Sequence, residues 1–420
     1  MSFLLGVLVV VIGLIVSVAL HECGHMLPAK RFGAAVPKYM VGFGPTLWAK
    51  RVGGTVYGIK AILLGGYVRI GGMFPPARAD EVIGSIDGEP IRAADYELMD
   101  RSRQQDVRLT LAQEAREASA ADLLDQHGRK AFWQLSASKK IVVMFSGPLV
   151  NLLLAVGCAV VTLAGIGVAV PETSLASVDS CSDASCHQAA FKGGLRSGDK
   201  ITSIGGVPTN SWQDITRQIK AHSSQLTPFE VIRDGHTRTV RVTIPSDGPI
   251  GITAATSRKR LSASQVAQSV WQQFTGTLAV IGKLPVQVFE VSKSVFTGAP
   301  RDPNGVVSVV GVGHIAGDVA STAKVTLTDR IAMLISLWGG VNMALFAFNL
   351  IPLLPLDGGH IAGALWEGVR NFLARMRGQK KPQPVDTARL MPLTYGVFGV
   401  FLLLTVLLVV ADFVVPIQLS

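Results

Sequence analysis

The sequence is poor in charged residues and in cysteine, and both shortages exclude classes of protein. Only 16% of its 420 residues are charged, while 49% are hydrophobic; ordinary soluble domains carry roughly 25% charged residues. Disorder needs low hydrophobicity and high charge, so it is excluded. A plain soluble enzyme is disfavoured as well. The four cysteines are too few for a disulfide scaffold.

The cysteines divide into two pairs by their surroundings. Cys23 and Cys158 lie in apolar runs, where we expect small buried side chains. Cys181 and Cys186 lie five residues apart in a polar stretch. They can form a disulfide if that stretch is outside the cytoplasm, and the sequence leaves both states open.

Some enzyme signatures are missing too. The glycine-rich runs lack a phosphate-binding fingerprint, and no Ser/His/Asp arrangement stands out.

The net charge of +10 comes from 39 basic and 29 acidic residues. A nucleic-acid binder rarely uses so few charges, so we expect no nucleic-acid partner. A basic but apolar chain fits a membrane protein with Lys/Arg-rich cytoplasmic loops.

Four apolar segments have the length of a membrane span, about 20 residues. They cover residues 3–20, 141–170, 331–354 and 395–410. No basic stretch precedes the first segment, and we interpret it as a retained helix and not as a cleaved signal peptide. Basic residues cluster at 30–60 and at 370–389. These two loops should therefore face the cytoplasm, with both termini and residues 171–330 outside.

The segments between the spans differ in character. Residues 39–72 predict short strands at 55–59 and 67–70, in either an ordinary hairpin or a sheet that dips into the bilayer. Residues 75–138 are polar, with a helical pattern near 93–126. Residues 187–255 predict a small β-rich module, and residues 262–296 predict an amphipathic helix pair.

The sharpest motif is His21-Glu22-Cys23-Gly24-His25, an HExxH sequence at the end of the first apolar segment. Residues four apart share one face of a helix, so both imidazoles can bind one Zn²⁺. Glu22 would then lie beside the metal, where it can accept a proton from water. Ionisable residues at membrane depth are costly and usually functional. The sequence therefore predicts a metal site.

A catalytic zinc needs a third protein ligand. Asp357 is the best candidate, because it ends an uncharged apolar segment that Pro352 and Pro355 should break. Considered alone, Asp357 would be a residue of a helix-ending turn. His314 and His360 are alternative third ligands. Asn349 could contact a substrate backbone or an oxyanion, or hydrogen-bond a neighbouring helix.

Together these motifs resemble the site-2 protease family of intramembrane zinc metalloproteases. The resemblance rests on HECGH, on NLIPLLPLDGG from Asn349, and on GPLVN from Gly147 to Asn151. VGFGPTLW and LLGGYV resemble the family's membrane-associated β region, and Arg196-Ser197-Gly198-Asp199 resembles part of its PDZ domain. The order of segments resembles the regulator-of-sigma-E-protease type, and HECGHM followed by YMVGFGPTLW most resembles actinobacterial members. That type often carries two PDZ modules, whereas this chain has room for one.

The resemblance implies a role for each matching residue. It makes His21, His25 and Asp357 zinc ligands and Glu22 the catalytic glutamate. Asn349 and Pro352 would contact the substrate strand. The implied cofactor is Zn²⁺. The implied partners are the lipid bilayer, single-span membrane substrates such as anti-sigma factors, and a site-1 type protease acting upstream.

We expect a polytopic α-helical membrane protein with about four transmembrane helices, a membrane-associated β region and one inserted PDZ domain. The expected segments are the first helix (1–28), the β region (29–74), a cytoplasmic insertion (75–138), the second helix (139–170), the extracytoplasmic PDZ domain (171–256), an extracytoplasmic amphipathic helical region (257–330), the third segment (331–365), a cytoplasmic loop (366–393) and the fourth helix (394–420).

The expected activity is zinc-dependent hydrolysis of a peptide bond in a substrate's transmembrane segment, after a prior extracytoplasmic cut. The PDZ domain would filter substrates, and the protein would lie in the bacterial cell membrane with its active site toward the cytoplasm. Two alternatives are a membrane-anchored zincin acting on soluble or misfolded proteins, and a PDZ membrane receptor with a non-catalytic metal site. Intact His21, Glu22, His25 and Asp357 argue against the receptor.

Overall fold

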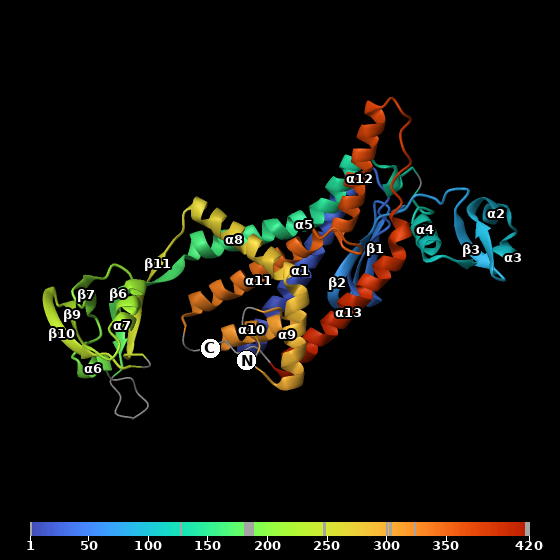
Figure 1. Ribbon diagram of the computed structural model, residues 1–420. Helices are drawn as coiled ribbons and strands as arrows, with labels where there is room; N and C mark the ends of the chain where they lie inside the picture. Colours follow the sequence, from blue (N-terminus) through green and yellow to red (C-terminus); the bar gives the residue numbers. More distant parts are fainter. Residues whose placement is uncertain are drawn as a thin grey trace. The chain divides into compact units, whose positions relative to one another are not determined.

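The computed structural model describes residues 2–126, 128–179, 189–246, 249–299, 301, 305–322 and 325–415. The chain forms two compact units (Figure 1). Unit 1 contains Met1–Val160 and Ala267–Ser420, and unit 2 contains Val161–Val266. Cys181 and Cys186 lie outside the described residues. Cys158 is buried and Cys23 is half-buried.

Four helical segments of the described chain are long and apolar enough to span a membrane. They are Ser2–Arg31, Ala137–Ile166, Leu327–Asn349 and Thr387–Val414. The corresponding elements are α1 (Ser2–Arg31), α5 (Ala137–Ala159) with the π-helical turn η2 (Val160–Ile166), α11 (Leu327–Asn349), and the 3-10 turn η3 (Thr387–Leu390) with α13 (Met391–Val414). This confirms the expected polytopic helical membrane protein.

The third apolar segment is broken, as its prolines predict. Helix α11 ends at Asn349, residues 350–356 are not helical, and α12 (Asp357–Met376) begins at Asp357. Asp357 therefore starts a helix and does not end one. Helix α12 is fixed to α5 by a buried ion pair between Lys140 Nζ and Glu367 Oε2 at 2.7 Å.

Polar contacts also join the apolar helices of unit 1. The Trp338 indole of α11 donates to the Gly13 carbonyl at 3.0 Å and to Ser17 Oγ at 2.8 Å on α1. Near the end of α13, the carboxylate of Asp412 accepts from Arg301 at 2.5 Å and from the Ser308 backbone N–H at 2.8 Å. The one carboxylate of α13 is thus paired, as a charge in an apolar segment must be.

The β region is one long hairpin, β1 (Lys38–Val52) and β2 (Thr55–Arg69), where the sequence predicted two short strands within 55–70. The start of β1, residues 38–41, pairs with residues 56–59 and also with residues 66–69 of the curved β2. No further strand of the described residues pairs with this sheet. The hairpin is tied to α1 because Tyr39 donates to the Ala19 carbonyl at 2.7 Å and Lys30 donates to the Tyr57 hydroxyl at 2.7 Å.

The insertion after the hairpin is more ordered than its polar sequence indicated. Strands β4, β3 and β5 form a three-stranded sheet in that order, and a strand interrupts the helical pattern expected near 93–126. The elements are β3 (Val82–Ile86), β4 (Glu89–Arg92), α2 (Ala93–Leu98), α3 (Arg101–Gln104), β5 (Arg108–Leu109), α4 (Leu111–Ala121) and the 3-10 turn η1 (Phe132–Gln134). Thr110 caps α4, since its hydroxyl accepts from the Gln113 N–H.

Three further helices precede the third span: α8 (Ala263–Gly282), α9 (Leu284–Thr297) and α10 (Val309–Ser321). Helices α8 and α9 match the expected helix pair and meet at an angle of 67°. Counted together, they are a fifth candidate span with a break.

Unit 2 is an antiparallel sheet with short helices against it. Its elements are β6 (Val168–Val178), α6 (Ala189–Lys192), β7 (Lys200–Ile204), β8 (Val207–Pro208), α7 (Trp212–Ala221), β9 (Leu226–Arg233), β10 (His236–Thr243) and β11 (Ile252–Lys259). The strand order is β10-β9-β7-β6-β11, with β8 beside β7. Ile201, Ile204, Ile215 and Phe229 are fully buried in its core. Asp199 closes the Arg196–Asp199 turn by accepting from the Arg196 N–H at 2.9 Å and from Arg233 at 2.6 Å.

Candidate metal centre and active site

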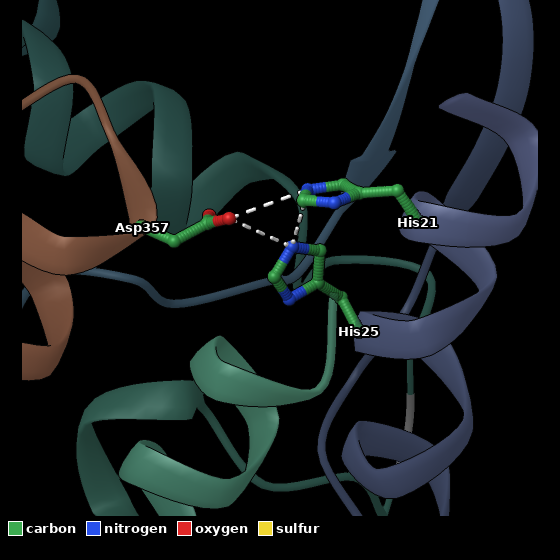
Figure 2. Close-up of side chains that lie close together, drawn as sticks. All are labelled: His21, His25 and Asp357. Atoms are coloured by element: carbon green, nitrogen blue, oxygen red, sulfur yellow. Dashed lines mark hydrogen bonds and ion pairs between the residues drawn. The ribbon is translucent and has the colours of Figure 1, made fainter. Parts of the chain in front are cut away.

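Three potential metal ligands meet in unit 1, although they come from opposite ends of the sequence. His21 and His25 lie one turn apart on α1, and Asp357 is the first residue of α12 (Figure 2). Their ligand atoms lie within 4.8 Å of one another. The two histidine Nε2 atoms are 3.2 Å apart, and each lies 3.3 Å from Asp357 Oδ2.

These distances fit a tetrahedral zinc ion. Ligand atoms at about 2.0–2.1 Å from a tetrahedral ion lie roughly 3.3–3.4 Å from each other. Asp357 Oδ2 is buried and accepts no hydrogen bond from the described residues, although each histidine Nε2 lies 3.3 Å away. Buried polar atoms in native proteins are nearly always satisfied, so an unpartnered carboxylate oxygen beside two imidazoles points to a cation as its partner. The donor set of two nitrogens and one oxygen suits Zn²⁺.

The two alternative ligands are not part of this group of described residues. His314 lies on α10, pairs with Asp318 at 3.2 Å and packs against Phe3. His360 lies one turn after Asp357 and lines the same cavity, but it is not among the three residues that converge.

Both imidazole rings are held through their Nδ1 atoms. His25 Nδ1 lies 2.8 Å from the Val143 carbonyl, and His21 Nδ1 lies 2.9 Å from Asn151 Oδ1. A carbonyl can only accept, so Nδ1 of His25 carries the proton. In the neutral ring, Nε2 then presents a lone pair toward Asp357. Hydrogen bonds at the second nitrogen are the usual way in which proteins fix a ligating histidine.

The GPLVN motif acquires a physical meaning from this packing. Gly147 and Asn151 are four residues apart on α5, and they contact His25 and His21, which are four apart on α1. A Cβ atom on Gly147 would lie 2.2 Å from His25 Nε2. On the other side, a Cβ on Gly24 would lie 2.6 Å from the Ser146 carbonyl oxygen. The helices approach this closely only because both positions are glycine.

The paired glycines after Asp357 fold the broken segment tightly. A Cβ on Gly358 would lie 2.2 Å from the Ile351 carbonyl oxygen, and one on Gly359 would lie 2.7 Å from the Leu354 nitrogen. Residues 350–356 therefore pack directly on the first turn of α12. This packing fixes the position of Asp357 at the helix start.

Glu22 lines the same cavity as the three candidate ligands and contacts the β hairpin. Its Oε2 atom accepts from the Val68 backbone N–H at 2.8 Å. Because that N–H points to Glu22, it is not used in pairing with β1. On the side away from β1, residues 66–69 thus form an edge that pairs with no other strand of the described residues, and its Val68 N–H points to Glu22.

The three candidate ligands, Glu22 and Val68 line one cavity of about 780 Å³. Its lining includes His21, Glu22, His25, Val68, Asn151, Asn349, Pro355, Asp357 and His360. The structure thus brings the predicted Asn349 to the cavity. Pro352 is exposed and is not among the lining residues, and Pro355 is there instead. Asn151 belongs to the GPLVN motif, but nothing in the sequence assigned it a role of its own.

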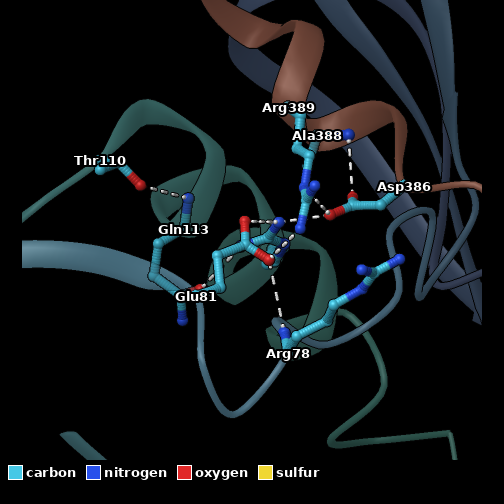
Figure 3. A network of polar contacts seen from close by, with 8 residues as sticks. Arg78, Glu81, Thr110, Gln113, Asp386, Ala388 and Arg389 are labelled. Atoms are coloured by element: carbon cyan, nitrogen blue, oxygen red, sulfur yellow. Dashed lines mark hydrogen bonds and ion pairs between the residues drawn. The ribbon is translucent and has the colours of Figure 1, made fainter. Parts of the chain in front are cut away.

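Helices α4 and α13 form another wall of the cavity, through Ala118, Ser119, Met391 and Tyr395 among others. An ion-pair network holds the insertion to η3 (Figure 3). Glu81 pairs with Arg116 at 2.8 Å and with Arg389 at 2.7 Å, and Asp386 pairs with Arg116. Burial alone would raise the pKa of Glu81, but hydrogen bonds from Arg389 and Arg116 lower it to about 2.

The fold and the site define a membrane protein whose apolar helices enclose a candidate metallohydrolase centre. The model of peptidase family M50 matches residues 9–393, and the chain therefore belongs to this family. Zinc metalloprotease Rip1 of Mycobacterium tuberculosis is 30% identical over 466 aligned positions, which cover 100% of both chains. Rip1 of Mycolicibacterium smegmatis is 30% identical over 462 positions with the same coverage. Zinc metalloprotease RasP of Geobacillus kaustophilus is 24% identical over 383 positions, covering 83% of this chain and 86% of the relative.

Membership of family M50 confirms the resemblance to site-2 proteases and the expectation of a metalloprotease. The expected cofactor, Zn²⁺, agrees with the names of these relatives. The mycobacterial relatives agree with the expected similarity to actinobacterial members.

Proposed function

We propose that this protein is a zinc-dependent endopeptidase that cleaves transmembrane segments of other membrane proteins from a site inside the bilayer. The observation that carries the proposal is the convergence of His21, His25 and Asp357 beside Glu22, on helices that include a candidate membrane span. His21, His25 and Asp357 would hold the metal. Zn²⁺ bound there would activate water and polarise the peptide carbonyl.

Glu22 is the proposed general base. Its side chain on α1 lines the cavity, and the Val68 N–H fixes one of its carboxylate oxygens. The other oxygen is then available to take the proton of the attacking water and to deliver it to the leaving amine. Asn349 on α11 would hold the substrate strand.

The substrate is expected to enter as an extended strand. A peptide bond within a helix is shielded by the helix's own hydrogen bonds, so the segment must unwind before cleavage. On the side away from β1, residues 66–69 pair with no other strand of the described residues, so their backbone groups other than the Val68 N–H can accept such a strand. The edge is next to Glu22, which supports strand addition as the way the scissile bond is presented.

Replacement of Glu22 by Gln tests the proposed chemistry. The variant should bind about one zinc per chain, because the three ligands remain, while cleavage of a purified single-span substrate in detergent should fall by at least about 100-fold. Glu89→Gln, at the exposed start of β4 in the insertion, is the matched control and should cleave normally. Wild-type turnover by Glu22→Gln would refute the assigned base.

A second experiment tests the third ligand. Zinc should be lost in Asp357→Ala and retained in His360→Ala; the reverse pattern would overturn the ligand assignment.

We propose further that unit 2 is a PDZ domain that filters substrates outside the cytoplasm. Its single helix-covered antiparallel sheet and its Arg196–Asp199 turn support this assignment. The filter would admit membrane proteins already cut by another protease, anti-sigma factors among them. The clusters of basic residues at 30–60 and 370–389 support an orientation in a bacterial cell membrane with both termini outside and the active site toward the cytoplasm.

A further inference from the structure

We propose that Asn151 acts in two ways, holding His21 in its ligating state with one end of its amide and donating to a substrate carbonyl with the other. The proposal rests on the zinc peptidase function proposed above. It concerns a side chain on α5 that is fully buried and yet lines the active-site cavity.

The first role follows from the chemistry of the imidazole. His21 Nε2 faces Asp357 and His25, so it must present a lone pair if it is to bind a cation. The ring proton is then on Nδ1, and the atom 2.9 Å away must be an acceptor. Asn151 is therefore oriented with Oδ1 toward His21, and this contact selects the ligating tautomer.

The second role follows from the amide nitrogen of Asn151, which this orientation leaves without a partner among the described residues. With Oδ1 facing His21, the amide nitrogen Nδ2 is buried and has no hydrogen-bond partner among the described residues. A buried donor without an acceptor is rare in native proteins and calls for an explanation. Since Asn151 lines the cavity that holds Glu22 and the open edge at 66–69, the missing acceptor is assigned to the substrate, as a main-chain carbonyl of the added strand.

Two comparisons within the molecule support this assignment. His25 is held by the Val143 main-chain carbonyl, so Asn151 is the one side chain of the described residues that bonds Nδ1 of either ligand ring. Asn342 on α11 also has an unpartnered amide atom, but that atom is the acceptor Oδ1, and Asn342 is not among the residues that line the cavity. The free donor of Asn151 is thus located where a peptide carbonyl can reach it.

The two roles are separable by substitution. Asn151→Asp keeps an acceptor for His21 Nδ1 and removes both amide donors, whereas Asn151→Leu removes acceptor and donors together. Each full-length variant is purified in detergent. Zinc affinity is measured by competition with a chromogenic chelator, and Co²⁺ absorption spectra report the ligand geometry independently of activity.

We expect Asn151→Leu to lose about 10- to 100-fold in zinc affinity and to change the Co²⁺ spectrum. Asn151→Asp should keep zinc affinity within a few-fold of the wild type, or bind more tightly, and keep the spectrum. Its cleavage of a single-span substrate at saturating zinc should nevertheless fall by about 100-fold. If Asn151→Leu does not fold, Asn151→Ala replaces it, because alanine adds no atoms to the packed interface.

The outcomes are decisive for each role. Unchanged zinc affinity and spectrum in Asn151→Leu, or in Asn151→Ala where it replaces Asn151→Leu, would overturn the orienting role. Wild-type turnover by Asn151→Asp would overturn the donor role. Failure of the proposed function is distinguishable, since the wild type itself would then not cleave while the metal measurements would still report on Asn151.

Discussion

At the scale of single residues, glycine shapes the metal centre as strongly as the ionisable side chains do. Gly147 lets α5 approach His25, and Gly24 lets the same helices meet from the other side. Gly358 and Gly359 let the broken segment fold onto the turn that carries Asp357. The three candidate ligands can lie this close together because four positions around them are glycine.

Replacement of Gly147 by Ala should therefore weaken zinc binding. The added methyl would lie 2.2 Å from His25 Nε2, so the ring must move or the helices must separate. We expect at least a 10-fold loss in zinc affinity, by analogy with other changes that disturb ligand orientation. Chelator competition in detergent measures it.

Gly157→Ala is the matched control, because Gly157 lies on the same helix and a methyl group added there would meet nothing within 4 Å. It should bind zinc like the wild type and be slightly more stable, by about 0.5–1 kcal/mol. Equal zinc affinities of Gly147→Ala and Gly157→Ala would show that this close contact does not position His25.

The ligand candidates are the part of the site that the sequence predicted best. The HExxH motif predicts the relative positions of its two histidines, because a four-residue spacing on a helix puts both on one face. Asp357 stands out because a lone carboxylate between prolines and glycines in an apolar segment is expensive. Asn151 does not stand out in the sequence, because an asparagine in a span can equally well make a hydrogen bond to a neighbouring helix. Its contact with His21 becomes visible only when α1 and α5 are seen to pack together.

At the scale of elements, the network of Glu81, Arg116, Asp386 and Arg389 fastens α4 to η3 beside the cavity. Arg116 is 4% exposed, so its charge is largely removed from water. Removing a buried partner costs about 3–5 kcal/mol and removing an exposed one less than about 1 kcal/mol. Arg389 would still neutralise Glu81 after Arg116 is removed. The free-energy cost of removing Arg116 should therefore lie between these two values.

We expect Arg116→Met to lower the local opening free energy of α4 by about 2 kcal/mol. Amide hydrogen exchange across residues 111–121 should then be roughly 30-fold faster. Arg51→Met is the control, since its ion pair with Asp125 is 58% and 75% exposed at the two side chains and should contribute little. Equal exchange rates in the two variants would mean that the network does not hold α4.

The same network should weaken in acid. The pKa of Glu81 is lowered from 4.5 to about 2, so folding favours its charged form. The stabilisation is complete above pH of about 4.5 and is lost as the pH falls toward about 2. Pepsin cleavage within residues 75–121 should rise over this window in the wild type. Glu81→Gln should be cleaved more readily throughout, with a weaker dependence on pH.

The elements of the insertion and the hairpin were less predictable than the spans. A span is recognised from a local run of apolar residues, independently of its neighbours. The double pairing of residues 38–41 depends on the curvature of β2 and on contacts with α1, which no local pattern encodes. The short strand β5 has two residues, Arg108 and Leu109, and exists only because β3 is beside it.

At the scale of the whole molecule, unit 2 is inserted into unit 1 through two neighbouring strand ends. Val168 at the start of β6 pairs with Lys259 at the end of β11. The chain therefore enters unit 2 and leaves it again at adjacent points. Because these two points are adjacent, the domain between them can be removed and the two cut ends of the chain can be connected by a short linker.

Excision of residues 169–258, with a short Gly-Ser linker between Val168 and Lys259, should leave the chemistry intact. Zinc content and cleavage of a pre-trimmed single-span substrate should stay within a few-fold of the wild type. Discrimination against the untrimmed form of that substrate should be lost. Paired cleavage assays on trimmed and untrimmed substrates measure both effects. Complete loss of turnover on the trimmed substrate, in a variant that still binds zinc, would contradict a filtering role for unit 2.

The separation of the ligands along the chain also sets the order in which the enzyme is assembled. Asp357 is synthesised 336 residues after His21. At about 5–20 residues per second, roughly 17 to 67 s pass between the two on the ribosome. During that time the nascent chain already contains HExxH and lacks Asp357, the proposed third ligand. On the proposed ligand set, a nascent chain that ends before Asp357 lacks one of the three ligands, so we expect the protease to become active only after the third span has been synthesised.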